Sequence, residues 1–84
     1  MKIYTLYIEQ YTRIKGVTRR PYGVYATEAD ANKAIMDYYR GENLGYYWQY
    51  YLLPADDELA GGKHIDFGSH STFFILMEED IEND

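Results

Sequence analysis

The strongest constraint on how this chain can fold is one aromatic run, Gly45–Leu53, which Pro54 ends. Seven of its nine residues are tyrosine, tryptophan or leucine. Such residues favour the half-buried pleated surface of a β-strand, and the run is too short and too aromatic for a typical helix. Because alternate side chains of a strand point to opposite faces, both faces would be apolar. We therefore expect this strand to lie inside a sheet, with a helix against one face.

The N-terminal part predicts a β-hairpin. Residues 2–12 alternate between apolar and polar positions, with Tyr4, Leu6 and Ile8 on one face. A turn follows over Thr12–Gly16, where Gly16 can adopt a positive φ. Residues 17–26 would return as the second strand. Its interruption at Pro21 predicts an edge, a bulge or a loop, because proline has no N–H to donate.

The next element is an amphipathic helix that begins after Thr27. The threonine hydroxyl can cap free N–H groups, and Asp30 stands three residues later as a shortened capping box. Gly41 is a natural end for the helix. The buried stripe follows the spacing of a helix face and comprises Ala31, Ala34, Ile35 and Tyr38.

The remaining segments complete one domain, residues 1–84. After a polar loop we expect strands over His64–Phe67 and Thr72–Met77, and then an acidic, frayed tail over 78–84. The order β-β-α-β-β-β predicts the α+β class, with an antiparallel sheet of four to five strands and one helix packed on one face. One helix cannot cover so wide a sheet, so we expect the other face to be partly exposed and rich in tyrosine.

Composition narrows the function classes. The chain has no cysteine, which excludes disulfides and thiolate metal sites and fits a reducing compartment. No apolar run has the roughly 18 residues of a membrane span, and the N-terminus lacks the apolar region of a signal peptide. We expect a cytoplasmic protein. No catalytic or cofactor motif stands out, so we expect a non-enzymatic protein without a cofactor.

The charge is uneven along the chain. Residues 1–42 carry a formal charge of +2 and residues 43–84 carry −8, which together give −6. Basic residues gather in the predicted hairpin, where Arg13, Lys15, Arg19 and Arg20 could contact phosphates. Nucleic-acid binders are usually basic, so we do not expect direct nucleic-acid binding in an acidic protein. A contact between the hairpin and acidic groups, within the chain or on a partner, is the alternative that we favour.

A segment running from the hairpin into the helix is similar to a pattern in small uncharacterised proteins of bacteria and their phages. It matches at Gly23, Val24, Tyr25, Thr27 and the helical residues Ala31, Ala34 and Ile35, whereas Ala26 replaces a serine and Ala29 stands where a glutamate is expected. The resemblance covers residues 1–53. It implies a ββαβ arrangement and a phage or mobile-element setting, and it implies no activity.

Two alternatives to a protein-interaction module remain open. His64 and Asp66 would share one face of a strand, and His70 could reach back across a turn, which gives a small-ligand or metal-binding site. Alternatively, an exposed sheet face could pair with itself in a homodimer.

Tyrosine, with 11 of 84 residues, is more abundant than a core needs. It is also a preferred interface residue, because it offers a large apolar body and a polar tip. We therefore predict a protein-interaction module, encoded by a phage or mobile element, that inhibits a host defence enzyme acting on nucleic acid in the manner of anti-CRISPR or anti-restriction proteins. Its partner would be a host protein with a basic groove. The predicted partner-binding residues are Tyr46, Tyr47, Trp48, Tyr50, Tyr51, Asp56, Asp57, Glu58, Glu78, Glu79 and Asp80.

Overall fold

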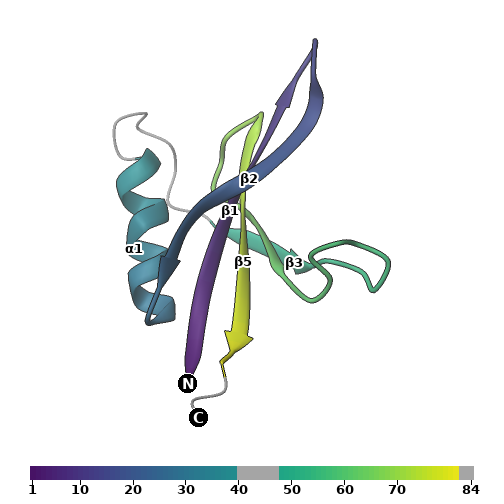
Figure 1. Cartoon of the computed structure of the whole chain (residues 1–84). Coiled ribbons are helices and arrows are strands. Elements are labelled where there is room, and N and C mark those ends of the chain that lie inside the picture. The colour runs from purple at the N-terminus through teal and green to yellow at the C-terminus, as the bar shows by residue number, and fades with distance from the viewer. Residues whose placement is uncertain (40–47, 82–84) are drawn as a thin grey trace.

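A computed structural model describes residues 1–39 and 48–81 of the chain, and it confirms the α+β class and the order β-β-α-β-β-β. Figure 1 shows the helix lying on one side of the sheet. Residues 1 and 81 lie side by side, because the Ile81 backbone N–H donates to the Met1 carbonyl at 2.6 Å. The described elements are β1 (Lys2–Thr12), β2 (Gly16–Tyr25), α1 (Glu28–Tyr39), β3 (Gln49–Leu52), β4 (Lys63–Asp66) and β5 (Thr72–Asp80).

The five strands form one antiparallel sheet in the order β2-β1-β5-β4-β3. The central strand is therefore β5, the last in the sequence. The expectation that the aromatic run lies inside the sheet is wrong, because residues 49–52 of the run form β3, an edge strand whose four residues are all exposed. Residues 45–47 of that run lie outside the described residues. The apolar runs of β1 and β5 supply the buried interior of the sheet instead.

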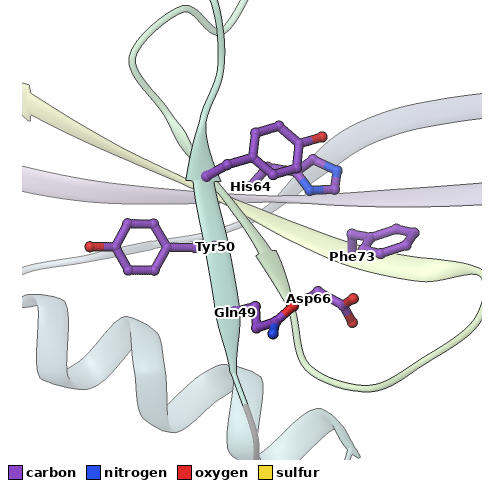
Figure 2. Close-up of a pocket in the computed structure, with 6 residues that line it drawn as sticks. Gln49, Tyr50, His64, Asp66 and Phe73 are labelled. Atoms are coloured by element: carbon purple, nitrogen blue, oxygen red, sulfur yellow. The ribbon is translucent and has the colours of Figure 1, made fainter.

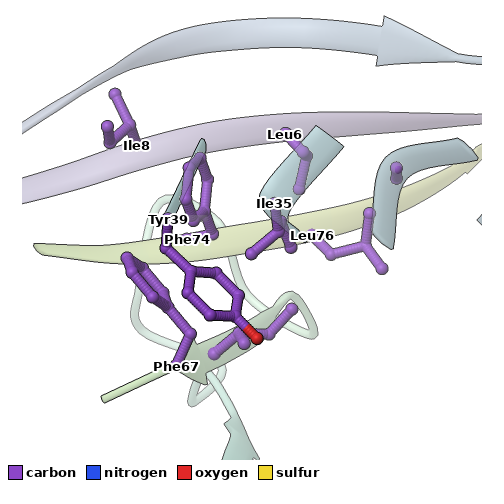
Figure 3. Close-up of a cluster of buried hydrophobic side chains, with 9 residues drawn as sticks. Leu6, Ile8, Ile35, Tyr39, Phe67, Phe74 and Leu76 are labelled. Atoms are coloured by element: carbon purple, nitrogen blue, oxygen red, sulfur yellow. The ribbon is translucent and has the colours of Figure 1, made fainter. Parts of the chain in front are cut away.

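The core lies between α1 and the sheet. Thr27 Oγ1 accepts a hydrogen bond of 3.1 Å from the Asp30 backbone N–H, which confirms the predicted cap. Ala31 and Ile35 are buried, and Ala34 and Tyr38 pack at the margin of the core, as the helical spacing predicts. The expected helix end at Gly41 lies outside the described residues. Figure 3 shows the side chains that meet in this cluster, which are Leu6, Ile8, Ala31, Ile35, Tyr39, Ile65, Phe67, Phe74 and Leu76.

The hairpin of β1 and β2 contains the irregularity that proline predicts. The pairing shifts between Leu6, which faces Gly23, and Tyr7, which faces Pro21, so Tyr22 is the extra residue of a β-bulge. The bulge turns the Tyr22 ring onto Phe74, with the two ring centroids 5.1 Å apart and nearly perpendicular. Pro21 thus lies in an edge strand beside a bulge, where its lack of an N–H donor does not interrupt a regular pattern of inter-strand hydrogen bonds.

The acidic end of the chain is more ordered than the expected frayed tail. Strand β5 runs through Asp80, because Glu78, Glu79 and Asp80 pair with the first residues of β1. Lys2 Nζ lies 3.5 Å from Glu78 Oε1, and the N-terminal amine lies 3.5 Å from Asp80 Oδ1. Residues 82–84 lie outside the described part.

The sheet face opposite α1, which we call the far face, is partly covered by the chain itself. Ile75 lies on this face and is nevertheless fully buried. The loop between β3 and β4 closes over it: Leu53 and Gly62 pair through a 2.9 Å backbone hydrogen bond, and a Cβ at Gly62 would stand 3.0 Å from Ile75 Cγ2. The part of the chain that the structure describes contains no helix long and apolar enough to cross a membrane.

Candidate functional site

A pocket on the far face is bounded by the two short strands β3 and β4. In their antiparallel register Gln49 faces Asp66 and Tyr51 faces His64, so these four side chains lie on the same face. Phe73 of β5 adds an aromatic wall, and the cavity measures about 380 Å³. Figure 2 shows His64, Asp66 and Phe73 on one side of β3 and Tyr50 pointing to the other side.

A polar network lies beside this pocket, across β5. His64 Nε2 lies 2.5 Å from Glu9 Oε2, although 55 positions separate the two residues in the sequence. Arg19 Nε donates to Glu9 Oε1 at 2.8 Å. The guanidinium of Arg19 also makes two bonds to the Asp57 carboxylate, at 2.7 and 3.1 Å. The network therefore ties β1, β2 and β4 to the loop that covers the far face.

The protonation behaviour of these groups follows from their contacts. Burial pushes the pKa of Glu9 upward, but the hydrogen bonds from His64 and Arg19 outweigh burial and hold the pKa below its ordinary value. The bond from Arg19 and a backbone N–H from Leu59 lower the pKa of Asp57. Hydrogen bonds to Asp57 and Glu9 raise the pKa of Arg19. Glu9 and Asp57 are thus carboxylates, and Arg19 is a permanent cation between them.

The ionised state of Glu9 fixes the role of His64 Nε2. An ionised carboxylate can only accept hydrogen bonds, so Nε2 must carry the proton that it shares with Glu9. His64 is only 7% exposed, and its Nδ1 is the one buried side-chain nitrogen or oxygen that finds no partner within the described residues. A buried polar atom without a hydrogen-bond partner costs about 1–3 kcal/mol of stability, and such atoms are rare in native proteins.

Aromatic rings hold His64 in place. The Tyr51 ring stacks on the imidazole at 4.7 Å with an angle of 22° between the planes, and the Phe73 ring lies at 4.9 Å. Together with the bond to Glu9, these contacts prevent the ring from turning to find another partner for Nδ1. The imidazole therefore lies fixed between the Tyr51 and Phe73 rings.

Two acceptors line the pocket. Asp66 Oδ1 accepts a 2.9 Å bond from the Gly68 backbone N–H, and no described cation pairs with its carboxylate. The Gln49 side chain is exposed and makes no side-chain hydrogen bond with any described residue. The pocket can therefore bind a group that donates several hydrogen bonds, and its carboxylate favours a positively charged one.

The predicted aromatic interface is divided by the structure. Tyr50 lies on the helix side of β3, where Lys63 Nζ sits 5.1 Å from its ring centre, whereas Tyr51 lies on the far face over His64. Trp48 packs against the core beside Tyr39. Tyr46 and Tyr47 lie outside the described residues.

The predicted acidic residues do not form one surface either. Asp57 is bound to Arg19, which confirms that a basic hairpin residue contacts acids within the chain. Glu78 is bound to Lys2 and Tyr4. Asp56 and Glu58 are exposed in the loop, Glu79 is exposed on β5, and none of the three forms an ion pair with a described residue.

The predicted metal set of His64, Asp66 and His70 is not assembled. Among the described residues no group of three or more histidine, cysteine or acidic side chains could hold a metal ion. The physical reason is that the His64 ring is turned toward Glu9, while Asp66 is used by the turn at Gly68. His64 and Asp66 do share a face, as predicted, because both line the pocket.

Three side chains at or beside the pocket were not predicted as site residues: Glu9, Gln49 and Phe73. Strand register brings them there, and no local motif reveals it. Arg19 faces Glu9 directly across the hairpin, so that contact follows from the register of the hairpin. The one available signal was Glu9 itself, the only charged residue on its face of the predicted strand.

Comparison of the chain with protein-family models, with curated proteins and with solved structures finds no match. The resemblance over residues 1–53 stays a prediction.

Proposed function

We propose that this protein is a non-enzymatic interaction module that binds a basic segment of a partner protein by adding it as a further strand beside β3. The observation that carries the proposal is the exposure of three successive large side chains on this edge strand: Tyr50 is 60% exposed, Tyr51 57% and Leu52 60%. A strand laid along the edge would cover side chains on both faces at once. Exposed apolar edges of this kind are otherwise liabilities that proteins avoid.

The backbone of β3 offers the matching hydrogen bonds. Leu53 N–H points toward β4, where it donates to Gly62. Backbone groups alternate in direction along a strand, so the N–H and C=O groups of Tyr50 and Leu52 point away from β4. An added antiparallel strand would bond to those groups, and the pockets beside them would select its side chains.

Charge favours a basic partner. The chain carries a formal charge of −6, and the exposed acids Asp56 and Glu58 lie in the loop that follows β3. Such charges increase the rate of association with a positive surface. The specific form of the proposal is an inhibitor of a host defence enzyme that acts on nucleic acid, since such enzymes carry basic grooves.

The direct test is photo-crosslinking in cells that carry the gene for this protein. A benzophenone amino acid replaces either Tyr51 of β3 or Val24 of β2, the opposite edge strand. Val24 is 64% exposed and is the matched control. We expect an adduct with another protein from position 51 and not from position 24. Adducts only between two copies would support the homodimer alternative and refute the proposal, as would equal labelling from both positions.

Once the crosslinked partner is purified, hydrogen exchange can test the mode of binding. The amides of Tyr50 and Leu52 should gain protection in the complex, whereas the amide of Tyr51, which already faces β4, should change little. The double variant Asp56→Asn, Glu58→Gln should slow association and reduce its salt dependence, and Asp30→Asn on α1 should not. Unchanged association in the double variant would remove the electrostatic part of the proposal.

A further inference from the structure

The hairpin of β1 and β2 ends in a tip, residues 11–17, that projects beyond the rest of the sheet. Strand β5 pairs with β1 only as far as Gln10, and the Tyr11 backbone N–H then donates to the Ser71 carbonyl at 2.9 Å. Figure 1 shows the two strands of the hairpin continuing past the other strands. All residues of the tip except Gly16 are exposed, so the tip offers its surface to solvent.

The turn at the tip presents apolar side chains in a fixed arrangement. The Lys15 backbone N–H donates to Thr12 Oγ1 at 3.0 Å, and Ile14 at the apex is 96% exposed, more than any other large apolar side chain described. A single exposed apolar residue is ordinary. Here, however, Tyr11 and Val17 face each other beside the turn and are 56% and 60% exposed. Three large apolar side chains therefore gather on one small projection.

The tip is also the basic end of an acidic chain. Half of the eight basic residues lie within 13–20, and none of the 14 acidic residues lies between positions 10 and 27. Arg19 is held by two carboxylates within the chain, but Arg13 and Lys15 form no ion pair with a described residue. Two unpaired cations thus flank the apolar apex.

We propose that the hairpin tip binds the surface of an anionic lipid bilayer, with Ile14 inserted among the acyl chains and Arg13 and Lys15 against the lipid phosphates. The side chains along the hairpin follow the layers of a membrane interface. An aliphatic residue stands at the apex, cations stand beside it, and Tyr11 stands further out, at the level that tyrosine prefers. Contact of this kind requires no membrane-spanning segment.

The aliphatic apex favours a bilayer over a nucleic acid. Both surfaces carry phosphates, but single-stranded nucleic acid binds through aromatic stacking, and the apex has no aromatic ring. An aliphatic side chain enters duplex DNA only by unstacking base pairs, which other proteins offset with a wide basic surface that this tip lacks. The formal charge of −6 opposes any polyanion at a distance, so the contact needs a short-range contribution. Burial of Ile14 in an apolar interior provides one.

The inference does not depend on the proposed function. The tip belongs to the β1 and β2 end of the sheet, whereas the added strand would lie at β3, the opposite edge. A chain that makes both contacts would bring its basic partner to a membrane surface.

Co-sedimentation with vesicles tests the contact on the intact chain. The protein is mixed with vesicles of phosphatidylcholine alone, or of equal parts phosphatidylcholine and phosphatidylglycerol, at low and at physiological salt. We expect binding to the anionic vesicles only, weaker at the higher salt, because the attraction between cations and lipid charges is screened.

Matched variants separate the apolar and the charged contributions. Ile14→Ser should weaken binding by about ten-fold or more, whereas Val24→Ser, at an aliphatic residue that is 64% exposed far from the tip, should not. Lys15→Gln should weaken binding by about five-fold, and Lys33→Gln, the same change of charge on exposed α1, should have little effect.

A second measurement reports insertion in the wild-type chain. Isoleucine methyl groups are followed by NMR in anionic bicelles that contain a lipid with a nitroxide in its acyl chain. The Ile14 signal should broaden, whereas that of Ile81, which is 41% exposed at the opposite end of β1, should not.

Three results would overturn the inference: no binding to anionic vesicles, unchanged binding of Ile14→Ser, or equal broadening of Ile14 and Ile81. Binding to duplex DNA that Lys15→Gln weakens, without binding to vesicles, would assign the tip to nucleic acid and refute the membrane contact. None of these outcomes bears on the crosslinks from position 51, so the two proposals can fail separately.

Discussion

Replacement of Glu9 by glutamine is the most informative perturbation of the fold. Glu9 is 9% exposed and accepts two close bonds, from Arg19 Nε at 2.8 Å and from His64 Nε2 at 2.5 Å. Glutamine has nearly the same shape but only one accepting oxygen, so one of the two donors loses its partner. Hydrogen bonds to charged groups contribute about 1.5–3 kcal/mol, and we expect Glu9→Gln to lower the free energy of unfolding by that amount at pH 7.

The same loss can be expressed as a melting temperature. A change of 1 kcal/mol shifts Tm by roughly 4–8 °C in a domain of this size, so Glu9→Gln should melt about 6–24 °C below the wild type. Urea unfolding followed by circular dichroism gives the free energy, and calorimetry gives Tm. Glu79→Gln removes an exposed charge on the same sheet and should stay within about 0.5 kcal/mol of the wild type.

The pH dependence separates the charge of Glu9 from its shape. The folded-state pKa of Glu9 lies below its unfolded value of about 4.3, so ionised Glu9 stabilises the fold above that pH and the contribution disappears as the pH falls through the folded-state pKa. The difference in the free energy of unfolding between the wild type and Glu9→Gln should therefore become smaller as the pH falls. A difference below 0.5 kcal/mol at pH 7, or one that stays constant at acid pH, would refute this account of the network.

Three further substitutions test separate parts of the fold by urea unfolding. Thr27→Ala removes the helix cap and should cost about 1 kcal/mol, with Thr27→Ser close to the wild type; equal loss in both would exclude the cap as the cause. Phe74→Ala empties a fully buried site against three aromatic rings and should cost about 3–5 kcal/mol, and a loss under 1 kcal/mol would contradict the assigned core. Gly16→Ala places a Cβ at φ +70° in the hairpin turn and should cost about 1 kcal/mol although the space is open, whereas Gly16→Asn, which tolerates this φ better, should cost less; the opposite order would refute backbone strain as the cause.

Local patterns predicted the local elements well. The alternation of β1, the cap at Thr27 and the stripe through Ala31 and Ile35 all depend on neighbours in sequence, and the structure confirms each. The bulge beside Pro21 was also predictable, because it depends on one residue that has no N–H to donate.

Strand order was not accessible in the same way. The many aromatic residues in 45–53 indicate that this run packs against other groups. The same residue types favour a strand in the interior of a sheet and an edge strand that binds a partner. The length of the described strand does not decide between them, because β4 also has four residues and lies between β5 and β3. The sequence suggested His64 as a metal ligand, whereas the structure pairs it with Glu9, a contact that arises only when β5 lies between their strands.

The central place of β5 has a consequence for how the chain acquires its structure during synthesis. The hairpin of β1 and β2 and the pair of β3 and β4 are joined within the sheet only through β5, which the ribosome makes last of the five strands. Until β5 emerges, both pairs expose the edges that will later receive it. Contacts between such distant segments close slowly. The nascent chain therefore passes through a stage with two unpaired edges, during which chaperone binding would protect it from aggregation.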